Sequence, residues 1–142
     1  MKYTVVIRTL GKAGDKFQKE LDSLCTQTIP PEDIIVYIAE GYPLPKETCG
    51  KERYVHVPKG MVAQRALPYH EVKTEWILFL DDDVYIPPTG VESLFNALKE
   101  NNAQVVSPDT FNNSSRSLKN ELMMAITGRM SARRGDKNMA IK

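Results

Sequence analysis

Three consecutive carboxylates, Asp81, Asp82 and Asp83, are the residues of this sequence best suited to chemistry, because they directly follow five apolar residues at 76–80. Adjacent like charges repel, so a fold keeps such a cluster where a cation or an array of hydrogen-bond donors relieves it. On an extended backbone, Asp81 and Asp83 point to the same side. Two such carboxylates suit one divalent cation whose other ligands are phosphate oxygens and water. The alternative is a solvated acidic turn, since turns favour aspartate.

Four further polar residues are candidates for the same pocket. Arg8 and Thr9 end the first apolar run, where Thr9 would hydrogen-bond a ribose or base and Arg8 would meet a phosphate. Glu40 follows the second apolar run, a position from which nucleotide-binding sheets hold a ribose hydroxyl. Arg65 would offer a fixed fork of donors to a phosphate or a uracil edge. Each has an ordinary alternative, a polar strand end or a surface arginine.

Alternating strands and helices are expected to position these residues. The apolar runs predict strands at 3–8, 34–38, 54–57, 76–80 and 104–107. Helical spacing predicts helices over 15–25, with Asp15 as the N-cap, and over 91–98. A helix within 60–72 would be kinked or start late because Pro68 lies inside it. This order is typical of an α/β domain with a largely parallel sheet of four to five strands.

The net charge of +1 divides into an acidic body and a basic C-terminal part, because residues 112–142 hold seven basic and two acidic side chains. We expect a core domain over 1–111 and a basic tail over 112–142 that is partly helical or disordered. Such a tail could contact a membrane surface peripherally. No apolar run is long enough to span a bilayer, and the two cysteines lack metal-ligand spacing. A cytoplasmic location, at the inner face of the membrane if the tail binds there, is expected.

Together these elements resemble family 2 glycosyltransferases of the GT-A fold. That family opens with a strand ending in a proline- or arginine-threonine pair, then a helix ending in Gln-Thr-x-x-Pro, and then a strand ending in an acid. It continues with a small-residue/arginine/asparagine helix and a Phe-Leu-Asp-x-Asp motif followed by a proline. The matching segments here are residues 5–9, 25–30, 34–40, 63–66 and 79–83, with Pro87 or Pro88 after them.

The resemblance implies a GT-A (Rossmann-like) three-layer sandwich that transfers a sugar, with inversion, from a nucleotide-diphospho-sugar to an acceptor hydroxyl. A UDP-sugar donor and a glycan or lipid-linked acceptor are expected, and no nucleic acid. Carried over by position, the nucleotide-binding residues would be Arg8, Thr9, Glu40, Arg65, Asp81 and Asp82. Asp83 and Asp81 would bind Mn²⁺ or Mg²⁺.

Three departures from the family pattern affect these expectations. Glu40 replaces the more usual aspartate, which lengthens its reach by a methylene, and Ala66 stands where asparagine is common. No residue matches the family's catalytic base, because Glu121 and Asp136 lie in no matching motif. We therefore expect the base, and the acceptor half, beyond residue 142, and a chain that binds donor but turns over poorly.

Two other enzyme classes and a binding module remain as alternatives. An Asp-nucleophile phosphatase shares an apolar strand followed by Asp-x-Asp, but Tyr85 occupies its Thr/Val position. A sugar nucleotidyltransferase shares metal-binding aspartates, but the loop at 11–14 lacks the glycines and arginine of its phosphate loop. A catalytically silent module would keep only the nucleotide pocket.

Overall fold

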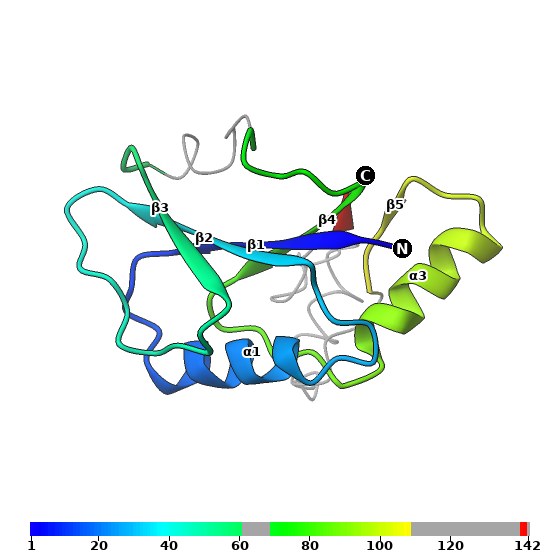
Figure 1. The fold of residues 1–142 in the computed structure, drawn as a ribbon, viewed down its shortest axis with the longest axis horizontal. Coiled ribbons are helices and arrows are strands. Elements are labelled where there is room, and N and C mark those ends of the chain that lie inside the picture. The colour runs from blue at the N-terminus through cyan, green and yellow to red at the C-terminus, as the bar shows by residue number, and fades with distance from the viewer. Residues whose placement is uncertain (61–68, 109–139, 142) are drawn as a thin grey trace, which may run out of the picture.

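The computed structural model describes residues 1–60, 69–108 and 140–141, and its centre is a six-stranded sheet in the order β3-β2-β1-β4-β6-β5 (Figure 1). Strands β1 (Tyr3–Thr9), β2 (Asp33–Ala39), β3 (Glu52–Val57) and β4 (Trp76–Asp81) are parallel. Strand β6 (Ala140–Ile141) runs antiparallel to β4 and to β5 (Val105–Val106). The α/β class and the mostly parallel sheet are therefore as predicted.

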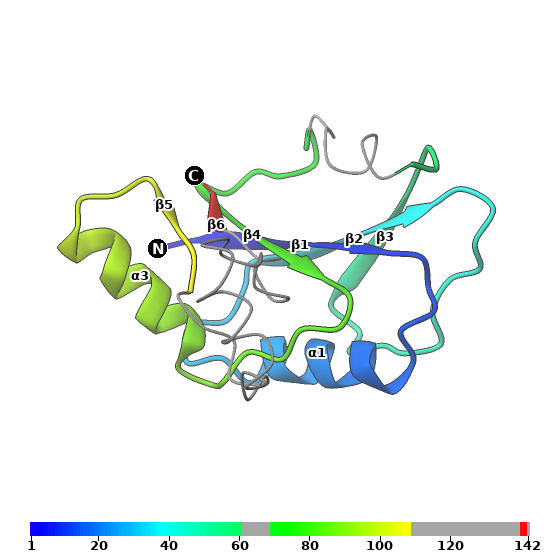
Figure 2. The same cartoon turned by 180° about the vertical axis from the view of Figure 1, so that it is seen from behind.

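Helices α1 (Asp15–Cys25) and α3 (Gly90–Glu100) lie on the same face of the sheet in both views (Figures 1 and 2). The apolar stripe of α1, formed by Phe17, Leu21 and Leu24, is buried against this face. Strand side chains alternate between the two faces, so Val5 packs toward the helices and Val6 packs on the opposite side. The central strands are mostly apolar because both of their faces are covered.

Aromatic side chains cover the second face. Tyr37 of β2 and Phe79 of β4 both meet the ring of Tyr69 edge-on, with centroid separations of 5.9 and 5.0 Å. Val72 packs against the same cluster. In the described part of the chain, the cover on this face therefore comes from the segment that leads into β4.

Each predicted strand is present, as are the helices predicted at 15–25 and 91–98, and three details differ. Strand β5 is shorter than expected, and the sequence did not predict β6, which brings residues 140–141 into the sheet. Asp15 is the first residue of α1 rather than its cap: Gly14 is the N-cap, and no side chain caps the helix. The helix predicted within 60–72 and the division at residue 112 lie largely outside the described residues.

No helix in the described ranges is long and apolar enough to cross a membrane.

The C-terminal end of α1 is joined to the segment between β4 and α3 by one buried amide. The side-chain nitrogen of Gln27 lies 2.9–3.1 Å from the carbonyl oxygens of Ser23, Ile86 and Pro87. Its side-chain oxygen accepts the backbone N–H of Val91 at 3.2 Å. Because Gln27 is only 6% exposed, water cannot replace these bonds. The amide therefore fixes the path of the chain between the acidic residues and α3.

Replacement of Gln27 by leucine tests this role. The substitution keeps the volume but leaves buried backbone groups without partners, so we expect the free energy of unfolding to fall by about 2–4 kcal/mol. Urea unfolding measures the change. Gln104→Leu, at an exposed position, is the matched control and should change stability little. Equal effects of the two substitutions would show that the Gln27 amide does not hold the loop.

Candidate active site

The candidate site lies at the carboxyl ends of β1 and β4. Between these two strands the order in which the chain adds strands to the sheet reverses. The chain adds β2 and β3 on one side of β1 and then places β4 on the other. Arg8 and Asp81 are direct partners in the β1–β4 register. Their side chains form an ion pair, with 3.0 Å between Arg8 Nη2 and Asp81 Oδ1. In open α/β sheets, ligands bind at such a switch point.

The end of β4 corrects one sequence expectation, and the Arg8–Asp81 pair adds a contact that the sequence did not predict. Strand β4 ends at Asp81 and the next two residues form a turn, so the extended geometry assumed for Asp81 and Asp83 is wrong. Arg8 relieves part of the charge of Asp81, as one of the two possibilities that the sequence left open, a donor or a cation. The Arg8 guanidinium is not fully used by this contact, because its buried Nε has no hydrogen-bond partner in the described structure.

Thr9 and Asp82 form a second link between the same two strand ends. The Thr9 hydroxyl donates to Asp82 Oδ2 and accepts the backbone N–H of Gly11 at 2.7 Å. Burial raises the pKa of the Asp82 carboxyl, the Thr9 bond lowers it, and the neighbouring carboxylates Asp83 and Asp81 raise it further. The net shift is upward, as expected for like charges close together. The acidic turn is thus fixed to β1 through a threonine that sequence reasoning had assigned to the nucleoside.

The remaining predicted residues are less constrained. Asp83 and Glu40 are exposed, and neither carboxylate has a hydrogen bond or ion pair with any described residue. Glu40 follows β2, where its backbone N–H donates to the carbonyl of Val57 at 2.8 Å. Arg65 lies outside the described residues. The structure therefore brings Arg8, Thr9 and the three aspartates together, and leaves Glu40 as a free acid at the neighbouring strand end.

Sequence reasoning missed Glu20, which lies beneath the acidic turn. Its side chain is fully buried on α1, and Oε2 accepts the backbone N–H of Val84 at 3.4 Å. Oε1 has no hydrogen-bond partner in the described part of the chain. Burial is the largest cause that raises the Glu20 pKa to about 9, the Val84 N–H opposes it, and the charges of the three aspartates add to the rise. Glu20 is therefore a neutral carboxylic acid near pH 7.

A signal for Glu20 was present in the sequence. Glu20 falls three residues after Phe17 and one before Leu21, so helical spacing places it on the apolar face of α1. An acidic residue on the buried face of an amphipathic helix needs a polar partner in the core. Here that partner is the backbone of the acidic loop.

Two lysines and a tyrosine at the same edge were also missed. Lys12 Nζ and Lys59 Nζ lie 5.1 and 5.2 Å from the ring centroid of Tyr42. The three residues come from the loops after β1, β3 and β2 respectively. The tyrosine ring attracts both ammonium groups and so keeps positive charge at the carboxyl edge of the sheet. No motif signals this cluster, because its members are far apart in sequence.

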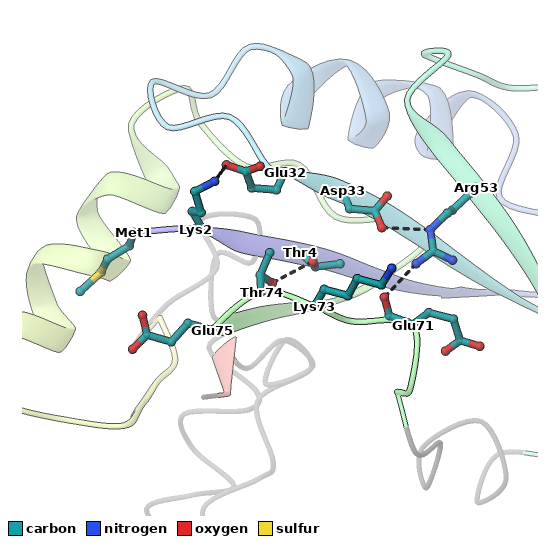
Figure 3. Close-up of a pocket in the computed structure, with 10 residues that line it drawn as sticks. All are labelled: Met1, Lys2, Thr4, Glu32, Asp33, Arg53, Glu71, Lys73, Thr74 and Glu75. Carbon is teal, nitrogen blue, oxygen red and sulfur yellow. Dashed lines mark hydrogen bonds and ion pairs between the residues drawn. The ribbon is translucent and has the colours of Figure 1, made fainter.

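A large open cleft lies at the opposite end of the strands (Figure 3). Its volume is about 860 Å³, and its charged groups largely neutralise one another. Lys2 pairs with Glu32 at 3.3 Å, and Arg53 pairs with Asp33 at 2.9 Å. None of the predicted site residues lines it. The cleft is therefore distinct from the candidate site.

Within residues 1–60 and 69–108, no three acidic, histidine or cysteine side chains are gathered closely enough to form a metal site on their own. Any cation at the acidic turn would need ligands from elsewhere, such as phosphate oxygens.

The sequence of residues 4–141 matches the model of the family described as Glycosyl transferase family 2. The chain belongs to this family. The match extends well past residue 110, where the motif resemblance ends, and includes the residues of β6. No curated protein matches the sequence.

Solved structures of S. aureus TarS share the GT-A fold with this chain. TarS 1–349 matches with a TM-score of 0.54 and 17% sequence identity, over 80% of this chain and 39% of that one. The complex of TarS 1–349 with UDP-GlcNAc gives the same score and identity, over 82% and 37%. At this identity the likeness shows the fold alone. The chain spans about two fifths of the TarS 1–349 chains that it matches.

The raised pKa of Glu20 predicts a pH-dependent stability. The ordinary pKa is 4.5 and the folded value is about 9, so the folded state binds the extra proton between these values. This stabilisation is fully present below pH 4.5 and is lost as the pH rises toward 9. In that window the free energy of unfolding should fall by up to about 1.4 kcal/mol per pH unit.

Glu20→Gln removes the titration while keeping a polar side chain of the same length. Urea unfolding of both proteins at pH 5 and pH 8 measures the effect, and the three aspartates that face Glu20 are common to both. The variant should gain stability relative to the parent at pH 8 and much less at pH 5. A difference that does not change with pH would contradict a neutral Glu20.

Proposed function

We propose that the chain is the donor-binding part of a glycosyltransferase that holds a nucleotide-diphospho-sugar at the carboxyl ends of β1 and β4. The observation that carries the proposal is the pair of links across the switch point, Arg8 to Asp81 and Thr9 to Asp82. They place three carboxylates where open α/β sheets bind nucleotides. Membership of glycosyl transferase family 2 supports sugar transfer as the chemistry.

The acidic turn has the chemistry of a divalent-cation site. Asp83 offers an exposed carboxylate, and Asp82 lies beside it with one oxygen bonded to Thr9. One or two carboxylates suit Mn²⁺ or Mg²⁺ when phosphate oxygens and water complete the coordination shell of the ion. A bound cation would supply charge neutralisation for a diphosphate leaving group. We assign the cation to Asp83 with Asp81 or Asp82, and the Arg8 pair makes Asp81 the weaker ligand.

The nucleoside would lie toward β2, beside the acidic turn. Glu40 follows β2 at this edge, and its exposed carboxylate could accept hydrogen bonds from ribose hydroxyls. Lys12 and Lys59 supply positive charge nearby. Arg8 lies at the same edge, with its charge paired to Asp81. Because TarS has been solved with UDP-GlcNAc and with UDP, uridine diphosphates are the donors to test first.

Transfer with inversion to a glycan or lipid-linked acceptor completes the proposal. An inverting transferase needs a base that deprotonates the acceptor hydroxyl. We assign this role to none of the described residues, and a base beyond residue 142 stays a prediction. The contact of the basic tail with a membrane and the cytoplasmic location also stay predictions.

Calorimetric titration of UDP tests the donor site. We expect binding with Mn²⁺ and little or none with EDTA, because a bound cation would offset the repulsion between the acidic turn and the diphosphate. Asp83→Asn should lower the affinity by about ten-fold or more, since it removes a charged ligand. Asp33→Asn, at the opposite end of β2, is the matched control and should bind like the parent. Equal binding with Mn²⁺ and EDTA would exclude the metal role.

The lysine cluster makes a separate prediction. Lys12→Ala and Lys59→Ala should each weaken UDP binding by about two- to five-fold, since an ammonium near a phosphate contributes modestly in water. The loss should shrink as salt is raised from low to high ionic strength, because salt screens exposed charges. Lys2→Ala, at the other end of the sheet, should leave the affinity unchanged. A loss that is independent of salt would argue against an electrostatic role.

A further inference from the structure

Glu20 is the only acidic or basic residue among the described buried side chains. An apolar residue would fill the same core position without the cost of burying a carboxyl group. One of its oxygens has no hydrogen-bond partner in the described chain, and three aspartates lie close enough to disfavour its ionised form. Packing alone therefore does not account for this residue.

Polar residues of α1 and of the chain just after it hold different parts of the loop after β4. Ser23 and Gln27 hold its distal part, because Ser23 Oγ accepts the N–H of Ile86 at 3.3 Å and Gln27 contacts the carbonyl oxygens of Ile86 and Pro87. The part nearest the acidic turn is held by Glu20, which accepts the N–H of Val84. Of these three residues, Glu20 alone contacts the chain within one residue of Asp83.

Asp83 therefore lies between two fixed points. On one side, Asp82 is bonded to Thr9 of β1, and on the other, Val84 is bonded to Glu20 of α1. The Asp83 side chain itself is exposed and has no partner in the described structure. Its direction is consequently set by its backbone, and the backbone is set by its two neighbours. Loss of either anchor would let the carboxylate move out of place without changing its charge.

We propose that Glu20 is a positioning residue that fixes the Asp83 backbone in the orientation needed to bind the donor. The inference rests on the proposed function for its binding readout, and on the Glu20–Val84 contact for its structural readout. Glu20 does not touch donor or cation in this assignment. It acts through Val84 and Asp83.

The test compares Glu20→Met, which keeps length and volume but has only a weakly accepting thioether, with Glu20→Gln, whose amide oxygen accepts well. With UDP and Mn²⁺, Glu20→Met should lose about ten-fold in affinity, as expected when one short-range anchor is removed. Glu20→Gln should stay within about two-fold of the parent, since its amide oxygen still accepts the Val84 N–H. Leu98→Ala in α3 controls for destabilisation alone and should leave the affinity unchanged.

A double substitution shows whether Glu20 acts through Asp83. If it does, Glu20→Met should cause little further loss in an Asp83→Asn background, because the two changes then remove the same interaction. Additive losses would overturn the proposal, as would equal affinities of the Met and Gln variants. If Glu20→Met does not fold, Glu20→Ala takes its place in the same comparison.

Hydrogen exchange of the Val84 amide separates the two hypotheses. Its exchange should be faster in Glu20→Met than in Glu20→Gln, measured without nucleotide. Faster exchange together with no UDP binding by the parent protein would defeat the proposed function but keep the anchor. Unchanged Val84 exchange would defeat the anchor whatever the nucleotide does.

Discussion

The position of the acidic turn depends on the polar side chains that α1 presents to the loop after β4. Two residues of this loop turn inward, Ile86 fully and Val84 partly, so their backbone N–H groups need partners in the protein. Glu20 and Ser23, three residues apart on one face of α1, accept the N–H groups of Val84 and Ile86, and Gln27, just beyond the end of the helix, accepts that of Val91. The same face carries the apolar residues that pack against the sheet. One helix therefore determines both the core and the course of the loop.

The pairing of β1 with β4 is the second constraint. Their register sets Arg8 opposite Asp81, and the next position along brings Thr9 to Asp82. A slip of one residue would turn every side chain of a strand to the other face and would separate both pairs. The buried apolar residues of β1 oppose such a slip, since both of its faces are covered. The core thus maintains the geometry of the polar edge.

Patterns within one segment made the fold and much of the site predictable. Apolar runs located β1, β2 and β4, and the order of motifs identified the acidic turn and the strand ends that meet it. Contacts between distant segments were not predictable: the Thr9–Asp82 bond, the Glu20–Val84 bond and the position of residues 140–141 depend on tertiary structure. The sequence left open whether Asp82 continues the strand or begins a turn, because strand pattern alone does not show where the pairing stops.

The placement of β6 has a consequence for the order of assembly during synthesis. Residues 140–141 lie between β4 and β5, so this side of β4 stays unpaired until more than thirty residues after β5 have been made. The four parallel strands can assemble earlier, from the first 81 residues. Until β6 arrives, the nascent chain presents an open sheet edge, the kind of surface on which other chains add strands. Chaperone protection would therefore matter most in this interval.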